Sequence, residues 1–581
     1  STWVLDDKVG AASDYNYDGY GYGVYYDDVH GDISASNPLL INNLLQRNTR
    51  VDRFVGTGSA DVDLLKMFGV DSKNHKLNYK INLSYSKTHC KDFTWIPSWI
   101  QSNRVYLAKS NERLEKASRD YSDALIENVL TYDGTIGKHH INIVAGQTYE
   151  EENTDLLTGW GLDYTEPYFL QLQNGSDTYS SSYEYKHAIL SYIGRVNYNY
   201  DDRYLFSATV RRDASSRLSS GIRWGTFPSV SVGWRFDKES FFPFNPDVVN
   251  MFKVRGSYGE LGNENIGEYM YQATMSRNNM TYSFNNSPVT GSAISTFVDN
   301  NLSWEKKKTY NVGVDLAFFN NRLEFTAEWY KNSSTDLLYD VPVPEQAGVS
   351  NTTVTMNAAS MENSGFEFSA TYRNREHPFK YEISANLSTL KNRVTSLGFG
   401  TDYYLTGDYI TYVGQEIGQF YGYIYEGIAR TQEDLDNHAT QEGANVGDCL
   451  YKDINNDGKV DTDDRVVLGS GLPKVNFGLN ARFEYKGFDL SIATYGALNY
   501  HVSDDIYNSL NSCYGWSNKD VAMLDANRFS EDGTTYLSNV PRTYITNSAS
   551  LAWNDLFSSR KIQNAAYWKI ANVELGYNFP H

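Results

Sequence analysis

The chain has 581 residues and a formal net charge of −20, with 51 Lys or Arg against 71 Asp or Glu. This charge argues against a nucleic-acid-binding protein, which needs clustered Lys and Arg to contact phosphates. Aromatic residues make up 15% of the chain, with Tyr (47) more frequent than Phe (27), and this content excludes an intrinsically disordered protein.

The beginning of the chain and its hydropathy give no sign of a helical membrane anchor. Ser1–Asp7 has neither the basic start nor the apolar core of a signal peptide. No run of about 18 apolar residues, the length of a transmembrane helix, occurs in the chain. Two classes remain, a soluble protein or a membrane β-barrel, whose alternating strands produce no hydropathy peak.

Residues 191–213 alternate between apolar and polar side chains with a period of two. Polar residues such as Arg195 and Asn197 occupy the odd positions. The even positions carry Tyr192, Val196, Tyr198, Tyr200, Tyr204, Phe206 and Val210. This pattern predicts two strands with one apolar and one polar face, separated by a turn at 201–203.

The same alternation recurs in later pairs of segments. They are 310–318 with 323–329, 366–372 with 381–387, and 475–485 with 488–492. Each predicted strand has about ten residues, which suits a tilted membrane-spanning strand.

The predicted connections differ sharply in length. Short turns are expected at 201–202, 320–321, 373–378 and 486–487. Long polar connections are expected over 260–309, 331–363, 389–474 and 496–566. Short turns at one end and long loops at the other are typical of outer-membrane barrels, whereas compact soluble domains rarely contain such long loops.

Aromatic residues gather where the predicted strands end. Tyr198 and Tyr200 face Tyr204 and Phe206 across a turn, and further clusters are Trp234 with Phe236 and Trp329 with Tyr330. Amphipathic rings at both strand ends are typical of the aromatic girdles of a membrane barrel. The simpler alternative is that aromatic residues favour strands of any kind.

Sequence motifs for catalysis are missing. We find no phosphate-binding Gly-x-x-x-x-Gly-Lys-Ser/Thr loop, no His-Glu-x-x-His and no Gly-x-Ser-x-Gly, and no carboxylate pair is singled out by its spacing. His139 and His140 are adjacent on a predicted strand, so their side chains should point to opposite faces and not share a metal. Cys90, Cys449 and Cys513 are too far apart for a zinc motif or a disulfide framework.

One segment, residues 453–464, follows the pattern of a calcium-binding loop. Oxygen-bearing side chains stand at its first, third and fifth positions and Gly458 at its sixth, where a sharp turn is needed. The predicted metal ligands are Asp453, Asn455, Asp457, the carbonyl of Lys459, Asp461 and Asp464. We expect a structural Ca²⁺ ion here. The alternative is an Asx-rich turn that needs no ion.

Several ordered segments resemble the SusC/RagA-like TonB-dependent outer-membrane transporters. They are Arg211–Arg217 with Trp224–Ser229, Ser257–Asn263, Asn301–Leu323, Tyr451–Asn480 and Ala565–Tyr577. The resemblance extends over about residues 40–581. It implies an all-β fold, a large antiparallel transmembrane β-barrel of about 22 strands when complete, closed around an N-terminal plug.

The resemblance also implies a function. Such a protein imports oligosaccharide or peptide fragments across the outer membrane of a Gram-negative cell, in outer-membrane lipid, and is not an enzyme. A SusD-like surface lipoprotein captures the substrate, and TonB acts through the N-terminal part. We therefore expect residues 1–581 to be the barrel portion with long extracellular loops, with the plug and the last strands outside this sequence. A surface-exposed adhesion barrel without transport and a secreted β-rich polysaccharide hydrolase remain alternatives.

Overall fold

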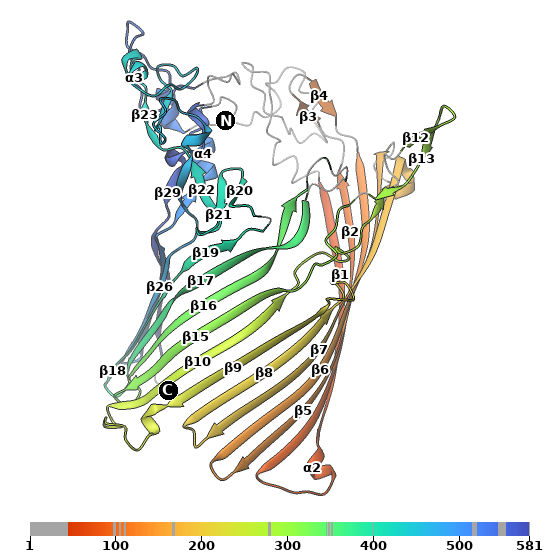
Figure 1. Ribbon diagram of the computed structural model, residues 1–581, viewed down its shortest axis with the longest axis vertical. Helices are drawn as coiled ribbons and strands as arrows, with labels where there is room; N and C mark the ends of the chain where they lie inside the picture. Colours follow the sequence, from red (N-terminus) through yellow and green to blue (C-terminus); the bar gives the residue numbers. More distant parts are fainter. Residues whose placement is uncertain are drawn as a thin grey trace.

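The computed structural model describes residues 45–579 except 97–99, 104–105, 110–111, 165–168, 277–280, 295, 344–345, 347–348, 350–352, 399, 514–519 and 544–552 (Figure 1). Most of the described chain forms one curved antiparallel sheet of 16 strands. In spatial order these are β1 (Gln46–Asp63), β2 (His75–Ile96), β5 (Arg113–Ile136), β6 (His139–Tyr164), β7 (Gly175–Tyr200), β8 (Tyr204–Ser215), β9 (Trp224–Arg235), β10 (Val249–Asn263), β15 (Glu305–Phe318), β16 (Leu323–Pro342), β17 (Thr353–Asn374), β18 (Phe379–Thr389), β26 (Val475–Tyr485), β27 (Phe488–Leu498) and β30 (Tyr567–Tyr577), with β19 (Lys391–Ser396) paired to β17.

Short turns join the strands at one end of the sheet, the lower end in Figure 1. Asp201 and Asp202 have φ values of 55° and 51°, and Lys486 and Gly487 have 48° and 87°. Two successive residues with positive φ form the tight hairpin turn whose twist matches that of the flanking strands. The short turns predicted from the sequence are confirmed. The first hairpin instead carries the one-turn helix α2 (Leu64–Met67).

Several strands are longer than the ten residues that the sequence predicts. β8, β18 and β26 have 11 or 12 residues, but β6 and β7 each have 26. The predicted long connection 331–363 is wrong, because β16 and β17 continue through most of it. The extensions carry polar residues on both faces, as in residues 176–184, so the two-residue period that reveals a half-buried strand is lost.

The register separates the two faces of the sheet. Ser207 pairs with Ser231, and Ser231 with Ser257, so the polar odd-numbered positions of these strands form one continuous inner face. The alternate positions place Phe206, Val230 and Val312 on the outer face, which is as apolar as the alternation predicted. The prediction that Trp329 and Tyr330 cluster at a strand end is wrong, because β16 continues to Pro342. Tyr330 also points inward, and its hydroxyl donates to the Thr389 carbonyl (3.0 Å).

The connections at the long-loop end fold into small units. The largest, which we call the loop unit, comprises the described parts of 397–474 and 499–566 and stands at the upper left in Figure 1. A buried cluster of Tyr423, Cys449, Tyr451 and Val460 forms its core. Its elements are β20 (Tyr403–Thr406), β21 (Tyr409–Tyr412), β22 (Gln419–Gly422), β23 (Tyr425–Ile428), α3 (Gln432–Asp436), β24 (Cys449–Tyr451), β25 (Val466–Ser470), β28 (His501–Ser503), α4 (Asp505–Leu510) and β29 (Ile562–Asn564).

Three smaller hairpins lie at the same end. They are β3 (Ile100–Asn103) with β4 (Tyr106–Lys109), β11 (Met275–Ser276) with β14 (Ala293–Ile294), and β12 (Thr281–Phe284) with β13 (Ser287–Thr290). In the part of the chain that the structure describes, the helices are all too short or too polar to cross a membrane.

Candidate substrate channel

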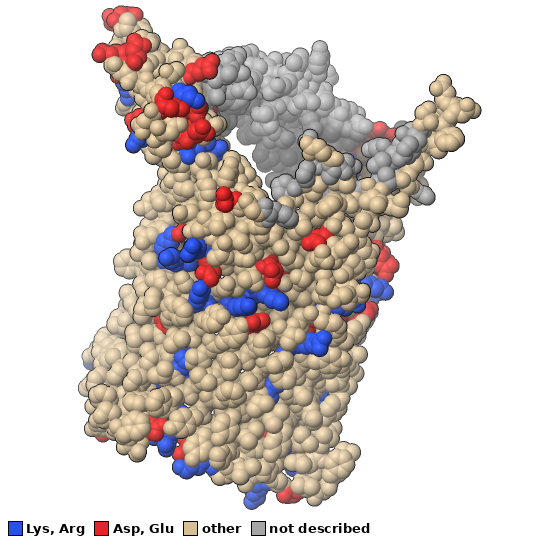
Figure 2. Space-filling model, in the orientation of Figure 1, with Lys and Arg blue, Asp and Glu red and all other residues tan. Residues whose placement is uncertain are grey.

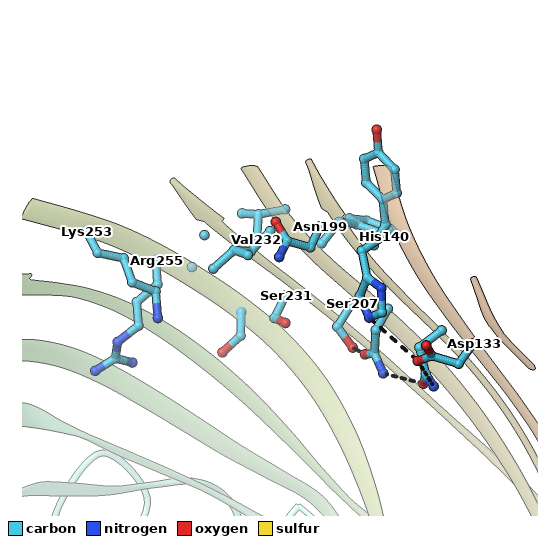
Figure 3. Close-up of a pocket in the computed structure, with 16 residues that line it drawn as sticks. Asp133, His140, Asn199, Ser207, Ser231, Val232, Lys253 and Arg255 are labelled. Carbon is cyan, nitrogen blue, oxygen red and sulfur yellow. Dashed lines mark hydrogen bonds and ion pairs between the residues drawn. The ribbon is translucent and has the colours of Figure 1, made fainter. Parts of the chain in front are cut away.

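The inner face of the sheet carries a chain of polar side chains that crosses several strands (Figure 3). The Asn142 amide donates to an Asp133 carboxylate oxygen (3.4 Å), and the Asn197 amide donates to the Asn142 carbonyl oxygen (3.2 Å). The Ser207 hydroxyl then donates to the Asn197 carbonyl oxygen (2.7 Å). These residues come from β5, β6, β7 and β8, and they meet because they stand opposite one another in the register.

A group of charged residues continues this polar surface onto β10, β15 and β16. The Arg255 guanidinium contacts Asp315 (3.3 Å) and Glu328, and the Lys253 ammonium lies 3.8 Å from Asp315. Gly313 leaves the space for this arrangement, since a Cβ atom there would lie 2.9 Å from the Arg255 guanidinium carbon. The inner face thus carries both signs of charge, with partners that hold the side chains in place.

Two cavities follow this inner face. One, of about 620 Å³, has Asp133 and His140 on one side and Lys253 and Arg255 on the other, as Figure 3 shows. A second, of about 760 Å³, extends toward the long-loop end, where Phe227 and Trp304 belong to a buried apolar cluster. The two cavities share Ser207, Ser231 and Ser257. They form one polar path along the wall, suited to ligands that exchange hydrogen bonds.

The two adjacent histidines lie on opposite faces, as the sequence predicted. His139 faces outward, where its Nδ1 lies 2.8 Å from the Tyr198 hydroxyl. His140 lies inside, with Nδ1 3.1 Å from the Thr135 hydroxyl and Nε2 3.6 Å from Asp133. They cannot share one metal ion from these positions.

The predicted calcium-type loop lies in the loop unit, between β24 and β25. Its glycine fulfils the predicted role, since Gly458 has φ of 86°. Asp453 accepts backbone N–H groups from Asn456 (2.7 Å) and Gly458 (2.9 Å). Asp464 is fully buried and accepts the N–H groups of Ile454 (2.7 Å) and Asp461 (2.8 Å).

The remaining predicted ligands of this loop bond within it. Asn455 accepts the N–H of Asp457 (2.9 Å), and Asp457 accepts the N–H of Lys459 (3.0 Å). The Lys459 ammonium binds Asp461, which lowers the pKa of that carboxyl and raises the pKa of the amine. Among the described residues, no group of three or more His, Cys, Asp or Glu is placed to hold a metal ion. The oxygen donors have the chemistry that Ca²⁺ prefers, and calcium binding stays a prediction.

The charged group around Arg255 is not evident from the sequence alone. The alternation over 323–329 predicts that Glu328 lies on a polar strand face, but its partners depend on which strands are neighbours and in what register. The available signal was the placement of Arg255, Asp315 and Glu328 on the polar faces of three strands that are consecutive in the main sheet.

Known proteins resemble this chain over nearly its full length. The family described as TonB dependent receptor-like, beta-barrel matches residues 2–580. TonB-dependent receptor P3 of Formosa agariphila is 30% identical over 80% of this chain and 46% of its own length. TonB-dependent receptor SusC of Bacteroides thetaiotaomicron is 29% identical over 94% of this chain and 52% of its own. The chain therefore spans about half the length of these curated relatives.

A solved structure confirms the fold. The structure described as the RagAB peptide transporter matches with a TM-score of 0.76 and 22% identity, and the match covers 95% of this chain and 58% of that one. At this identity the likeness concerns the fold, that of a TonB-dependent transporter barrel.

Proposed function

Because the chain belongs to the TonB-dependent receptor-like β-barrel family and is an outer-membrane β-barrel protein, we propose that it forms the wall of an importer for oligosaccharide or peptide fragments. Import is driven by TonB, and a SusD-like surface lipoprotein delivers the substrate. The long-loop end is extracellular and the short-turn end faces the periplasm.

The observation that carries this proposal is the polar inner path beside an apolar outer face. The outer face matches lipid, so the polar groups from Asp133 to Arg255 face the lumen. Hydroxyl, amide and paired ionic groups can exchange hydrogen bonds with a passing hydrophilic ligand. The plug and the contact with TonB would belong to the part of the protein outside this chain.

The family is one of receptors and transporters, so the alternative of a secreted polysaccharide hydrolase is wrong. The alternative of an adhesion barrel differs from the proposal in one property, energy-dependent uptake.

The test compares uptake in cells that carry or lack the complete gene. Cells would receive fluorescent malto-oligosaccharides or a fluorescent tryptic digest of casein, with and without dissipation of the proton gradient. We expect gradient-dependent uptake of at least one probe, which deletion of the gene abolishes. Equal uptake by both strains would contradict import. Surface binding that survives dissipation, with no uptake, would favour the adhesin.

A matched pair of variants tests the channel wall. Arg255→Glu reverses a charge on the inner face, whereas Arg212→Glu changes an arginine that lies over the Trp224 ring (5.0 Å) on the outer face. We expect uptake to fall only in Arg255→Glu, with both proteins showing the heat-modifiable gel migration of a folded barrel. Equal uptake in the two variants would show that Arg255 is not on the path.

The lipoprotein partner is tested by purification. The complete protein, isolated from membranes in mild detergent, should bring down a surface lipoprotein in a fixed ratio. Its consistent absence would contradict a capped importer.

We also propose a structural Ca²⁺ ion at residues 453–464, supported by the oxygen donors and by Gly458. Calorimetric titration of chelator-treated protein with Ca²⁺ should give one site that Asp457→Ala abolishes and Asp532→Ala, elsewhere in the loop unit, leaves intact. If the two variants gave the same heat of Ca²⁺ binding, the loop would be a turn that needs no ion.

A further inference from the structure

β7 extends far above the strand that follows it in the sheet. β7 pairs with β6 from Gly175 to Tyr200, but it pairs with β8 only from Ile189 to Tyr200. Over residues 176–184, the edge of β7 that faces away from β6 pairs with no strand in the part of the chain that the structure describes. A long open edge of this kind is a template for an additional strand.

The hydrogen bonds at the base of this edge show which backbone groups point to it. The Ala188 N–H donates to the Ser216 hydroxyl (2.9 Å), and the Ala188 carbonyl accepts from the Ser216 N–H (3.0 Å). The Lys186 N–H donates to the Tyr269 hydroxyl (3.3 Å). Both groups of a strand residue point to the same side, so the even-numbered residues present theirs to the open edge. These are Thr178, Ser180, Ser182 and Glu184.

Aromatic rings accompany the open edge on the inner face. Tyr179 and Tyr183 are 49% and 55% exposed. Tyr179 stacks on Trp160 of β6, with ring centroids 5.6 Å apart, and Tyr183 stacks on Tyr185 at 6.0 Å. Such rings are cross-strand partners for the side chains of an added strand.

The inner face beside this edge has an unbalanced negative charge. Asp123 and Glu152 stand directly opposite each other on β5 and β6, although like charges in that position are destabilising. One carboxylate oxygen of Asp123 is buried and has no hydrogen-bond partner. On this inner face β6 carries Glu150 and Glu152 but no Lys or Arg, and Glu152 lies 3.8 Å from His187 Nδ1.

A buried carboxylate at the base of the edge is also only half satisfied. Glu264 is 8% exposed, and one of its oxygens lies 3.1 Å from His187 Nε2. Its second oxygen is buried without a hydrogen-bond partner, and the residue lines the upper cavity together with Ile189. An unpartnered buried carboxylate oxygen is costly, and a ligand that brings a cationic donor would relieve this cost.

We propose that this site binds an extended basic peptide, which adds as a strand to the open edge of β7 over residues 176–184. Its backbone bonds to the even-numbered residues, and its Lys or Arg side chains face the carboxylates of Glu152 and Glu264. The open edge ends beside Ile189, which lines the second cavity, so the site lies at the long-loop entrance of the channel.

The alternation of backbone donors and acceptors selects this occupant. A peptide matches their spacing along the whole edge, whereas a sugar cannot repeat it. The acidic inner face and the unpartnered oxygen of Glu264 add the preference for positive charge. The inference rests on the proposed import function, since it assigns the substrate class.

The test uses the complete receptor in detergent and a fluorescent ten-residue peptide of alternating Lys and Val. Ser180→Pro with Ser182→Pro removes two N–H groups from the open edge and leaves the bonds to β6 intact. Ser180→Ala with Ser182→Ala is the matched control. We expect about tenfold weaker binding in the proline variant only, because two hydrogen bonds are lost. Unchanged binding in the proline variant would overturn the proposal.

Two further comparisons test the charge and the ligand class. Glu264→Gln should weaken binding of the Lys-Val peptide several-fold, while a Glu-Val peptide should bind poorly to every form. Methylation of alternate peptide nitrogens should abolish binding. If the Glu-Val peptide bound as tightly as the Lys-Val peptide, the proposed preference for basic peptides would be wrong. Displacement of the Lys-Val peptide by maltoheptaose would also contradict a basic-peptide site.

The outcomes separate this site from the import function. Gradient-dependent uptake of malto-oligosaccharides without peptide binding would leave the importer in place and remove the site. Peptide binding that depends on the β7 edge, without any uptake, would keep the site and remove the importer.

Discussion

The strand wall and the loop unit solve the problem of burying apolar groups in opposite ways. On the wall, Val312 and Leu575 of the outer face are 54% and 72% exposed, and lipid must cover them. In the loop unit, Tyr451 and Cys449 are 1% and 0% exposed, as in a small water-soluble domain. Figure 2 shows acidic side chains gathered over the upper-left lobe that carries α3. One chain thus contains a part adapted to lipid and a part adapted to water.

The difference extends to charged groups. Asp448 of the loop unit is fully buried, and both of its oxygens bond to Arg542 (2.8 Å each). Asn554 also donates to Asp448 (2.8 Å), so this carboxylate joins two parts of the loop unit that are distant in the sequence. Charged groups of the wall, such as Arg255, line a polar path instead. Specific pairs hold the loop unit together, whereas the wall is held by backbone pairing between strands.

The largest expected effect concerns the buried carboxylate. Asp448→Ala should destabilise the loop unit by about 3–5 kcal/mol, because it leaves Arg542 without its partner. Hydrogen exchange of the complete receptor should show residues of β24 opening, while the strands of the wall keep their protection. Asp525→Ala, at the exposed ion pair with Arg528 elsewhere in the loop unit, is the control and should leave the protection of β24 unchanged. Loss of protection throughout the wall would contradict the independence of the two parts.

A thiol probe sharpens the same contrast. Burial raises the pKa of the Cys449 thiol to about 12. At pH 8 its thiolate is therefore roughly a thousandfold rarer than that of an ordinary thiol, equivalent to about 4 kcal/mol. Iodoacetamide should modify the partly exposed Cys90 of the wall first and reach Cys449 only when the loop unit opens. Peptide mass mapping over time would detect this order, and Asp448→Ala should accelerate the second reaction. Equal rates in the native protein would contradict a packed core.

A charge on the outer face tests whether lipid covers the wall. Val230→Arg places an arginine between the girdle residue Trp234 and the other end of β9, and should cost about 2–4 kcal/mol of unfolding free energy in lipid vesicles. Ser231→Arg, one residue away and facing the lumen, is the matched control. Urea unfolding followed by gel migration gives both values. A larger cost for Ser231→Arg would mean that the two faces are reversed.

The smallest effect concerns the end of α3. Asp434 accepts the backbone N–H of Thr431 (2.9 Å), and this bond is the main reason that the pKa of the Asp434 carboxyl is lowered. Asp434→Ala should cost about 1 kcal/mol locally. The stabilisation is present above the ordinary carboxyl pKa near 4 and is lost as pH falls through the lowered value. Hydrogen exchange should show that α3 is better protected in the native protein than in Asp434→Ala at pH 7, and that this difference disappears below pH 4. A difference in protection that does not change with pH would contradict this role.

The sequence predicted the strand faces and hairpin turns well but failed at the strand extensions. The alternation around Val196 identifies a strand with one buried face, and paired turn residues such as Asp201 and Asp202 mark the hairpins. The upper half of β7, including Ser180 and Tyr183, has no such period because no core lies on either side of it. Its open edge, and hence the proposed peptide site, therefore had no periodic signal in the sequence.

The −20 charge, the alternating strands and the tight turns are local properties, so the sequence by itself determined an antiparallel wall with a lipid face and a polar face. Only the tertiary structure decided which residues meet. Arg255, Asp315 and Glu328 join through strand register, and Asp448 reaches Arg542 across 94 residues of chain. Register and loop packing depend on non-local pairing, which local periodicity does not encode.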